Sequence, residues 1–151
     1  MEPTFTVAGD GDIEQLVELM HEFYAVEHLT FDEQLTRGAL RQILSDGSVG
    51  AVYLVGDGDD IVGYLVLTFG FSLEFHGRDA LIDELYLRES HRGRGFGKAC
   101  LRHAEAVCRS EGVRALHLEV GRVNTRAQAV YRKAGYRDHD RHLLTKWLGE
   151  E

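Results

Sequence analysis

The residues with the clearest chemical potential form a basic, glycine-rich loop, Arg92-Gly93-Arg94-Gly95-Phe96-Gly97-Lys98. Glycines allow successive backbone N–H groups to converge on one point, and a helix that begins within the loop adds the partial positive charge of its N-terminus. Such a loop can hold a phosphate group. Two familiar phosphate loops do not fit, because Walker A needs glycine in place of Arg92 and the dinucleotide fingerprint needs glycine in place of Lys98.

A pair of carboxylates, Asp83 and Glu84, lies just upstream of this loop. A carboxylate there can accept a proton from an ammonium group, directly or through water, or can attract a cationic substrate. Successive side chains of a strand point to opposite faces, so only one of the two can face a given side. The residue pattern alone leaves open which of the two carboxylates serves as a base and which binds a cation.

Metal and disulfide chemistry are not expected. His117-x-Glu119 and the pair His139 and His142 lack a third ligand at a suitable spacing, so they indicate surface or strand histidines. Cys100 and Cys108 fall within one expected helix, where eight residues at a rise of ~1.5 Å place them about 12 Å apart. That separation is too large for a disulfide.

The charge is distributed unevenly along the chain. Residues 1–87 carry 17 Asp and Glu against three Arg, a net charge of −14, whereas residues 88–151 carry 8 Asp and Glu against 14 Lys and Arg, a net charge of +6. The asymmetry suggests that the first part meets a cation and the second an anion, although solvated surface charge gives the same pattern. Nucleic acid is not an expected partner, because the basic part lacks interleaved aromatic residues and the acidic part repels a polyanion.

Residue patterns predict the elements that position these groups. Helices are predicted where apolar residues recur at helical spacing: about 13–26, Leu35 to a stop at Asp46-Gly47, Phe96 to Gly112, and Thr125–Lys133. Strands are predicted at Thr4–Ala8, Ala51–Val55, Ile61–Phe71, Ala80–Leu87, Ala115–Val120 and His142–Leu148. This order predicts one α/β domain over residues 1–151, with a mixed sheet and a parallel crossover through the helix that begins at Phe96.

No membrane partner is expected. The longest uncharged stretch, Ile61–Leu73, is too short to span a bilayer, and the N-terminus carries no visible secretory signal. We therefore expect a cytoplasmic protein.

Two segments together resemble the motifs of one family. Arg92–Gly97 reads R-x-x-G-x-G after Asp83-Glu84-Leu85-Tyr86-Leu87, and this combination resembles the acetyl-CoA loop of the GNAT superfamily of N-acetyltransferases. The run Asn124 to Tyr136 resembles that superfamily's N-x-x-A-x-x-x-Y-x-x-x-G-[FY] segment. Both motifs lie within residues 80–137, in the family's order and spacing. One position departs from the pattern: Glu89 stands where proline is common. The likeness to diamine acetyltransferases is fair around Asp83–Lys98.

The resemblance implies a single-domain acyl-CoA N-acyltransferase (GNAT) fold, with a mixed central β-sheet whose strands splay and are flanked by helices. In such a fold the pantetheine arm of acetyl-CoA enters between the strands matching 80–87 and 115–120. It bonds backbone amides at the positions matching Leu85 and Leu87, and Asn124 is expected to bind it from the other side, which is compatible with a helix-capping role. The pyrophosphate is expected on the amides of Gly93, Arg94, Gly95, Phe96, Gly97 and Lys98, with charge added by Arg92 and Lys98.

The resemblance also implies the chemistry. Tyr131 matches the family's general acid near the sulfur, and Glu84 is the expected base. The expected reaction is direct attack of a primary amine on acetyl-CoA, with no metal. The expected acceptor is a small cationic amine, such as a polyamine, a lysine-like amino acid or an aminoglycoside. The carboxylates expected to attract it are Glu18, Glu22, Glu27, Asp32 and Glu33.

Two other functions remain open at this point. One is an acetyltransferase of protein N-termini or lysines. The other is a non-catalytic acyl-CoA-binding regulatory module, against which the intact Tyr131, Asn124 and glycine loop argue. A homodimer is counted among the expected assemblies.

Overall fold

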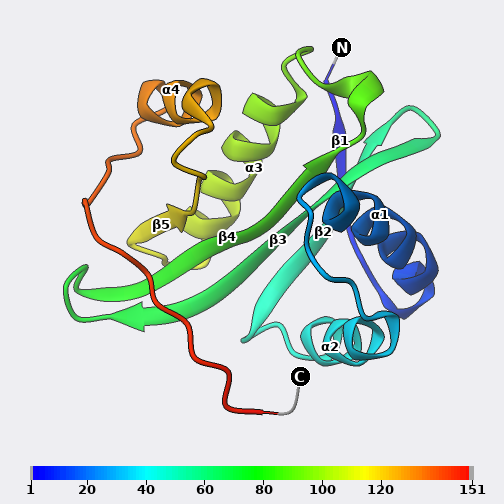
Figure 1. Ribbon diagram of the computed structural model, residues 1–151, viewed down its shortest axis with the longest axis horizontal. Coiled ribbons are helices and arrows are strands. Elements are labelled where there is room, and N and C mark those ends of the chain that lie inside the picture. Colours follow the sequence, from blue (N-terminus) through cyan, green and yellow to red (C-terminus); the bar gives the residue numbers. More distant parts are fainter. Residues whose placement is uncertain (1, 150–151) are drawn as a thin grey trace. The chain divides into compact units, whose positions relative to one another are not determined.

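The computed structural model describes residues 2–149, and the chain divides into two compact units, one ending at Glu119 and one beginning at Val120. The first unit is a five-stranded mixed sheet with the order β1-β2-β3-β4-β5 (Figure 1). Its strands are β1 (Thr4–Val7), β2 (Gly50–Asp57), β3 (Asp60–Ser72), β4 (Gly77–Leu87) and β5 (Ala115–Leu118). The first four strands pair antiparallel, and β4 pairs with β5 in parallel. The predicted mixed sheet and parallel crossover are confirmed.

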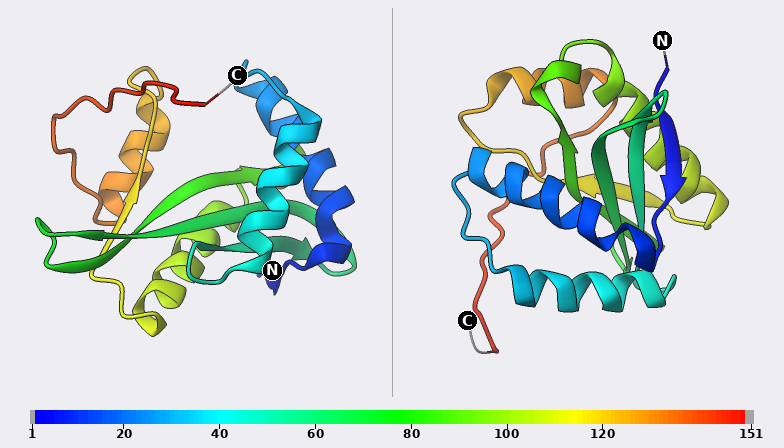
Figure 2. Two further views of the ribbon diagram at one scale, coloured as in Figure 1. Left: turned by 90° about the horizontal axis from the view of Figure 1, so that it is seen from below. Right: turned by 90° about the vertical axis from the view of Figure 1, so that its right-hand side faces the viewer.

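Helices cover both faces of this sheet. Helices α1 (Ile13–Val26) and α2 (Glu33–Ser45) pack on one face and α3 (Phe96–Ser110) on the other, as both views of Figure 2 show. The apolar stripe of α1 contributes Leu16, Leu19 and Met20 to the core. Short 3-10 turns at Asp10–Asp12 and Glu89–His91 precede α1 and α3. Helix α2 begins where the Asp32 carboxylate accepts a hydrogen bond from the Leu35 amide at 3.0 Å.

The side-chain alternation of β3 and β4 divides the core in two. Tyr64 and Tyr86 are cross-strand partners and face α1 and α2. Leu85 and Leu87 face the opposite way and pack with Phe96 of α3. Because the period of a strand is two, alternate residues of β4 serve two different layers.

The second unit contains α4 (Thr125–Lys133), with the bounds that the sequence predicts. The predicted strand His142–Leu148 is wrong: residues 134–149 form neither helix nor strand. A strand exists only where its backbone pairs with another strand, and apolar composition does not supply that partner. The apolar side chains of this segment are instead exposed, namely Leu143, Leu144, Trp147 and Leu148. Strand β5 also ends earlier than predicted, at Leu118 instead of Val120.

Candidate active site

The loop between β4 and α3 has the backbone geometry of an anion cradle. Gly93 and Gly95 have φ angles of 73° and 86°, in the left-handed region that disfavours side chains. The first backbone bond of α3 is donated by the Ala99 amide to the Gly95 carbonyl oxygen at 3.1 Å. Within the described chain, the preceding amides from Gly93 to Lys98 donate no hydrogen bond. Unpaired N–H groups at the start of a helix are suited to binding phosphate oxygens.

Arginine side chains fasten this loop to its surroundings. The Arg92 Nε donates to the Leu87 carbonyl oxygen at 2.9 Å, and its guanidinium lies 5.7 Å from the centroid of the Tyr86 ring. Arg94 donates to the Ser90 carbonyl oxygen at 3.3 Å. Arg92 thus ties the loop to the end of β4, and its predicted contribution of charge to a phosphate stays a prediction.

His91, next to the glycine loop, also holds the loop in place. His91 Nε2 lies 2.9 Å from a carboxylate oxygen of Asp57, at the turn between β2 and β3. The Ser90 hydroxyl lies 2.8 Å from His91 Nδ1. Asp57 and His91 are 34 residues apart in the chain, so no local sequence pattern could pair them.

Among the described residues, no strand pairs with the outer backbone edge of the C-terminal half of β4. Strand β5 pairs with β4 only from Asp79 to Ile82. The Arg88 amide donates to the Val62 carbonyl oxygen of β3 at 2.8 Å. Amides alternate in direction along a strand, so those of Leu87 and Leu85 point away from β3. These are the two amides that were predicted to bond the pantetheine arm, and here they face the side on which β5 has ended.

Glu84 lies on the face of β4 opposite these leucines, between two tyrosines. Asp83, the preceding residue in the chain, is exposed. Tyr24 of α1 donates to Glu84 Oε2 at 2.5 Å, and Tyr64 of β3 donates to Oε1 at 2.7 Å. Burial raises the pKa of Glu84 above its ordinary value, and the two phenol hydrogen bonds oppose part of that rise. Burial and the Glu84 carboxylate in turn raise the pKa of both tyrosines, which keeps them protonated as donors. Neither tyrosine was identified from the sequence.

The neighbouring carboxylates are not all available to a substrate. Glu22 forms a double hydrogen bond with Arg88, at 3.1 and 2.9 Å, and accepts a third from the Tyr86 hydroxyl at 3.0 Å. Arg88 holds the pKa of Glu22 below its usual range. Glu33 is paired with Arg37, and Asp32 caps α2. Glu18 also lies 4.0 Å from the Arg88 guanidinium, so four of the five carboxylates expected to attract a cation have internal partners.

The remaining predicted site residues, Asn124 and Tyr131, belong to the second unit. The Asn124 side-chain oxygen accepts a hydrogen bond from the Ala127 amide at 3.2 Å, so the capping role is confirmed. Tyr131 packs edge-on against Tyr136, with ring centroids 6.1 Å apart. Burial raises the pKa of Tyr131, so its phenol remains a proton donor across the neutral range.

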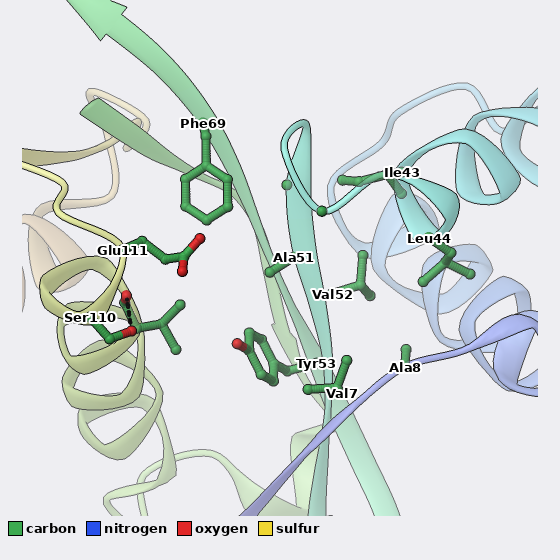
Figure 3. Close-up of a pocket in the computed structure, with 13 residues that line it drawn as sticks. Val7, Ala8, Ile43, Leu44, Ala51, Val52, Tyr53, Phe69, Ser110 and Glu111 are labelled. Carbon is green, nitrogen blue, oxygen red and sulfur yellow. Dashed lines mark hydrogen bonds between the residues drawn. The ribbon is translucent and has the colours of Figure 1, made fainter. Parts of the chain in front are cut away.

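Among residues 2–149, no three His, Cys, Asp or Glu side chains come together as ligands of a metal ion. None of the helices described has the length and apolar character needed to cross a membrane. A hollow at the edge of β2 lies between the C-terminal ends of α2 and α3 and is lined by Ala51, Tyr53, Phe69 and Glu111 among others (Figure 3). It contains none of the predicted site residues.

Comparison with known proteins identifies relatives along most of the chain. A sequence model of the acetyltransferase (GNAT) family matches residues 13–136. Thialysine N-epsilon-acetyltransferase of Bos taurus is 27% identical over 87% of this chain and 82% of its own length. Streptothricin acetyltransferase of Streptomyces lavendulae is 26% identical over 80% of this chain and 66% of its own length.

Solved structures share the same fold. An integron cassette protein from the mobile metagenome of Cole Harbour Salt Marsh is 33% identical, with a TM-score of 0.85 over 97% of this chain and 91% of that chain. A protein of Clostridium acetobutylicum described as a predicted acetyltransferase, solved with acetyl-CoA, has a TM-score of 0.80 over 95% of this chain and 96% of that chain, at 16% identity.

Proposed function

The chain belongs to the GNAT family of acetyltransferases, and we propose that its reaction transfers the acetyl group of acetyl-CoA to the primary amine of a small cationic acceptor. Suitable acceptors are a polyamine, a lysine-like amino acid or an aminoglycoside. We treat residues 1–151 as one N-acetyltransferase domain with the acetyl-CoA motifs in 80–137. The observation that carries the proposal is that two groups of unpaired backbone amides follow one another along the chain. The unpaired edge of β4 leads directly into the loop whose amides, Gly93 to Lys98, donate no hydrogen bond within the described residues.

The loop fits the pyrophosphate of acetyl-CoA. A Cβ built on Gly97 would meet no atom within 4 Å, so space remains beside the amides for an anion to approach closely. The amides of Leu85 and Leu87 extend the same binding edge along β4, where an elongated ligand can pair with them as a strand would. Arg92, Lys98 and Asn124 would complete the binding set.

The catalytic roles follow from the proton balance of acetyl transfer. Acetyl-CoA supplies the acetyl group as a thioester. As the new C–N bond forms and the C–S bond breaks, the amine must lose a proton and the departing sulfur must gain one. We assign to Glu84, directly or through water, the proton that the ammonium group loses to become a neutral nucleophile. Tyr131 donates its proton to the sulfur, and the resulting phenolate takes the proton that the nitrogen loses as the C–N bond forms. Glu84 accepts a hydrogen bond from each of two phenols, which favours its ionised form against the burial that raises its pKa. Burial raises the pKa of Tyr131, which keeps its proton in place.

The preference for a cation rests on the carboxylates without internal partners. Asp83 is exposed beside Glu84 and forms no ion pair within the described residues. Glu27, at the end of α1, is exposed in the same way. Residues 1–87 also carry a net charge of −14, which raises the local concentration of a cation.

A thiol-release assay with acetyl-CoA across an amine panel tests this proposal. We expect turnover with polyamines, lysine analogues or aminoglycosides, and little with neutral amides. Turnover with peptide N-termini or protein lysines alone would replace the acceptor class. Acetyl-CoA binding without thiol release for any amine would instead support a non-catalytic acyl-CoA-binding module.

We also propose that the protein forms a homodimer through its C-terminal segment. Leu144 and Leu148 are 89% and 92% exposed, and within residues 2–149 the sheet ends at β5, which pairs only with β4. In a two-fold dimer, the C-terminal segment of each copy would lie against the β5 edge of the other copy. Both segments would be covered at once, and both copies would use the same sheet edge. Sedimentation velocity should therefore find a dimer that Leu144→Asp dissociates. Leu73→Asp, at an equally exposed position in the β3–β4 turn, should leave the dimer intact. A wild-type monomer at micromolar concentration would contradict the proposal.

A further inference from the structure

The Glu84 carboxylate is held by two phenols that come from two different elements. Tyr24 reaches it from α1, 60 residues away in the chain, and Tyr64 reaches it from β3, 20 residues away. Each phenol donates to a different carboxylate oxygen, at 2.5 and 2.7 Å. A carboxylate bound at one oxygen can still rotate, whereas donors on both oxygens fix the plane of the group.

The two tyrosines differ in their surroundings. Tyr64 is 0% exposed and belongs to the core under α1, so its hydroxyl requires a buried acceptor. Tyr24 is partly exposed near the end of α1, and its ring packs against Phe23 and Phe31. A purely structural role would require Glu84 only as an acceptor for Tyr64. Tyr24, the more accessible donor, is not needed to satisfy the buried hydroxyl of Tyr64.

We propose that Tyr24 and Tyr64 are positioning residues for acetyl transfer, which hold the Glu84 carboxylate ionised and in a fixed orientation for the acceptor amine. This inference rests on the proposed role of Glu84 as the base. The two tyrosines do not exchange protons with the amine themselves. They act through Glu84, and α1 thereby becomes part of the site that sets the activity of the base.

The expected effect on pH dependence has a definite sign. The titratable groups that act on Glu84 are Tyr24 from α1, Tyr64 from β3 and Asp83 from β4. Burial and Asp83 raise the pKa of Glu84, and the two phenols lower it. Removing one phenol should therefore raise that pKa, and the base becomes protonated at a higher pH. Because a hydrogen bond to a charged group is stronger than one between neutral groups, we expect a shift of about one pH unit.

The test is the pH profile of kcat/KM for the variants Tyr24→Phe and Tyr64→Phe. Each change removes one hydroxyl and keeps the ring. The matched control is Tyr86→Phe, which faces the same layer but donates to Glu22. We expect the acidic limb to move up by about one pH unit in the first two variants and to stay in place in the control. The KM for acetyl-CoA should not change. Because the amine's own ionisation contributes to this limb, the shift should be the same with two acceptors of different pKa.

The outcomes separate the inference from the function on which it rests. If Glu84→Gln abolishes turnover while both tyrosine variants keep the wild-type profile, the inference is wrong and the base assignment stands. If Glu84→Gln keeps the wild-type turnover and acidic limb, the base assignment itself is wrong. Should Tyr64→Phe fail to fold, Tyr24→Phe decides alone, since its side chain is partly exposed.

Discussion

The glycine loop offers a perturbation that separates ligand binding from folding. Gly97 lies in the first turn of α3, has no positive φ, and a Cβ built on it meets no atom within 4 Å. Gly97→Val should therefore place its side chain in the space that a phosphate would occupy, without a clash inside the protein. Gly95→Val lacks this property, because a φ of 86° strains any side chain at that position.

The size of the expected loss in acetyl-CoA affinity follows from the number of amide hydrogen bonds that a displaced phosphate would lose. A hydrogen bond to a charged group contributes about 1.5–3 kcal/mol, and about 1.4 kcal/mol corresponds to a tenfold change in Kd. Loss of one amide should raise the Kd for acetyl-CoA roughly tenfold, and loss of two should raise it on the order of 100-fold. Folding stability should hardly change, because valine and glycine differ by only about 0.5 kcal/mol in helix propensity.

Isothermal titration calorimetry with acetyl-CoA measures the affinity, and thermal unfolding of the same samples measures stability. The matched control is Gly38→Val in α2, where a Cβ also meets nothing within 4 Å and φ is not positive. We expect both variants to fold and only Gly97→Val to lose affinity. A folded Gly97→Val protein with the wild-type Kd would refute the assignment of the loop to the pyrophosphate.

Three further results are expected. Tyr131→Phe should lower kcat by ~10²-fold with an unchanged Kd for acetyl-CoA, since it removes a proton donor and keeps the ring; because burial raises the pKa of Tyr131 above 10.0, wild-type kcat should show no loss from its ionisation below that pH. The KM of a cationic acceptor should rise with ionic strength, because charges are screened over about 8 Å at ~0.15 M salt; a KM independent of salt would remove the electrostatic argument. Glu22→Gln should cost about 1 kcal/mol of folding stability at neutral pH, measured by urea unfolding. Arg88 lowers the pKa of Glu22, so this stabilisation is complete above the ordinary value of 4.5 and is lost as the pH falls below it. A difference between wild type and variant that persists at low pH would contradict the pairing.

Local patterns predicted the elements well where they depend on local chemistry. The apolar spacing that predicts a helix over 13–26 gives α1 at Ile13–Val26, and α4 matches Thr125–Lys133. The glycines of the loop were expected to let backbone N–H groups converge, and Gly93 and Gly95 have left-handed φ angles that non-glycine residues rarely adopt. These features depend on residues within a few positions of one another, which a sequence displays directly.

The features that escaped prediction depend on distant residues or on the sheet as a whole. The register of β4 shifts against β3 next to Asp83, because Val66 pairs with Glu84 and Leu67 with Ile82. Simple alternation therefore cannot assign the faces of Asp83 and Glu84. The phenols on Glu84 come from elements 60 and 20 residues away, and the predicted last strand lacked a partner that composition cannot reveal.

The central claim is that this chain moves an acetyl group from acetyl-CoA to an amine. It is tested most directly by incubating the protein with acetyl-CoA labelled in the acetyl group and a polyamine, and locating the label by mass spectrometry. The account predicts label on a primary amine of the polyamine, in molar excess over the protein and dependent on both substrates. Label that remains in acetyl-CoA, or that appears only as free acetate whether or not amine is present, would contradict it.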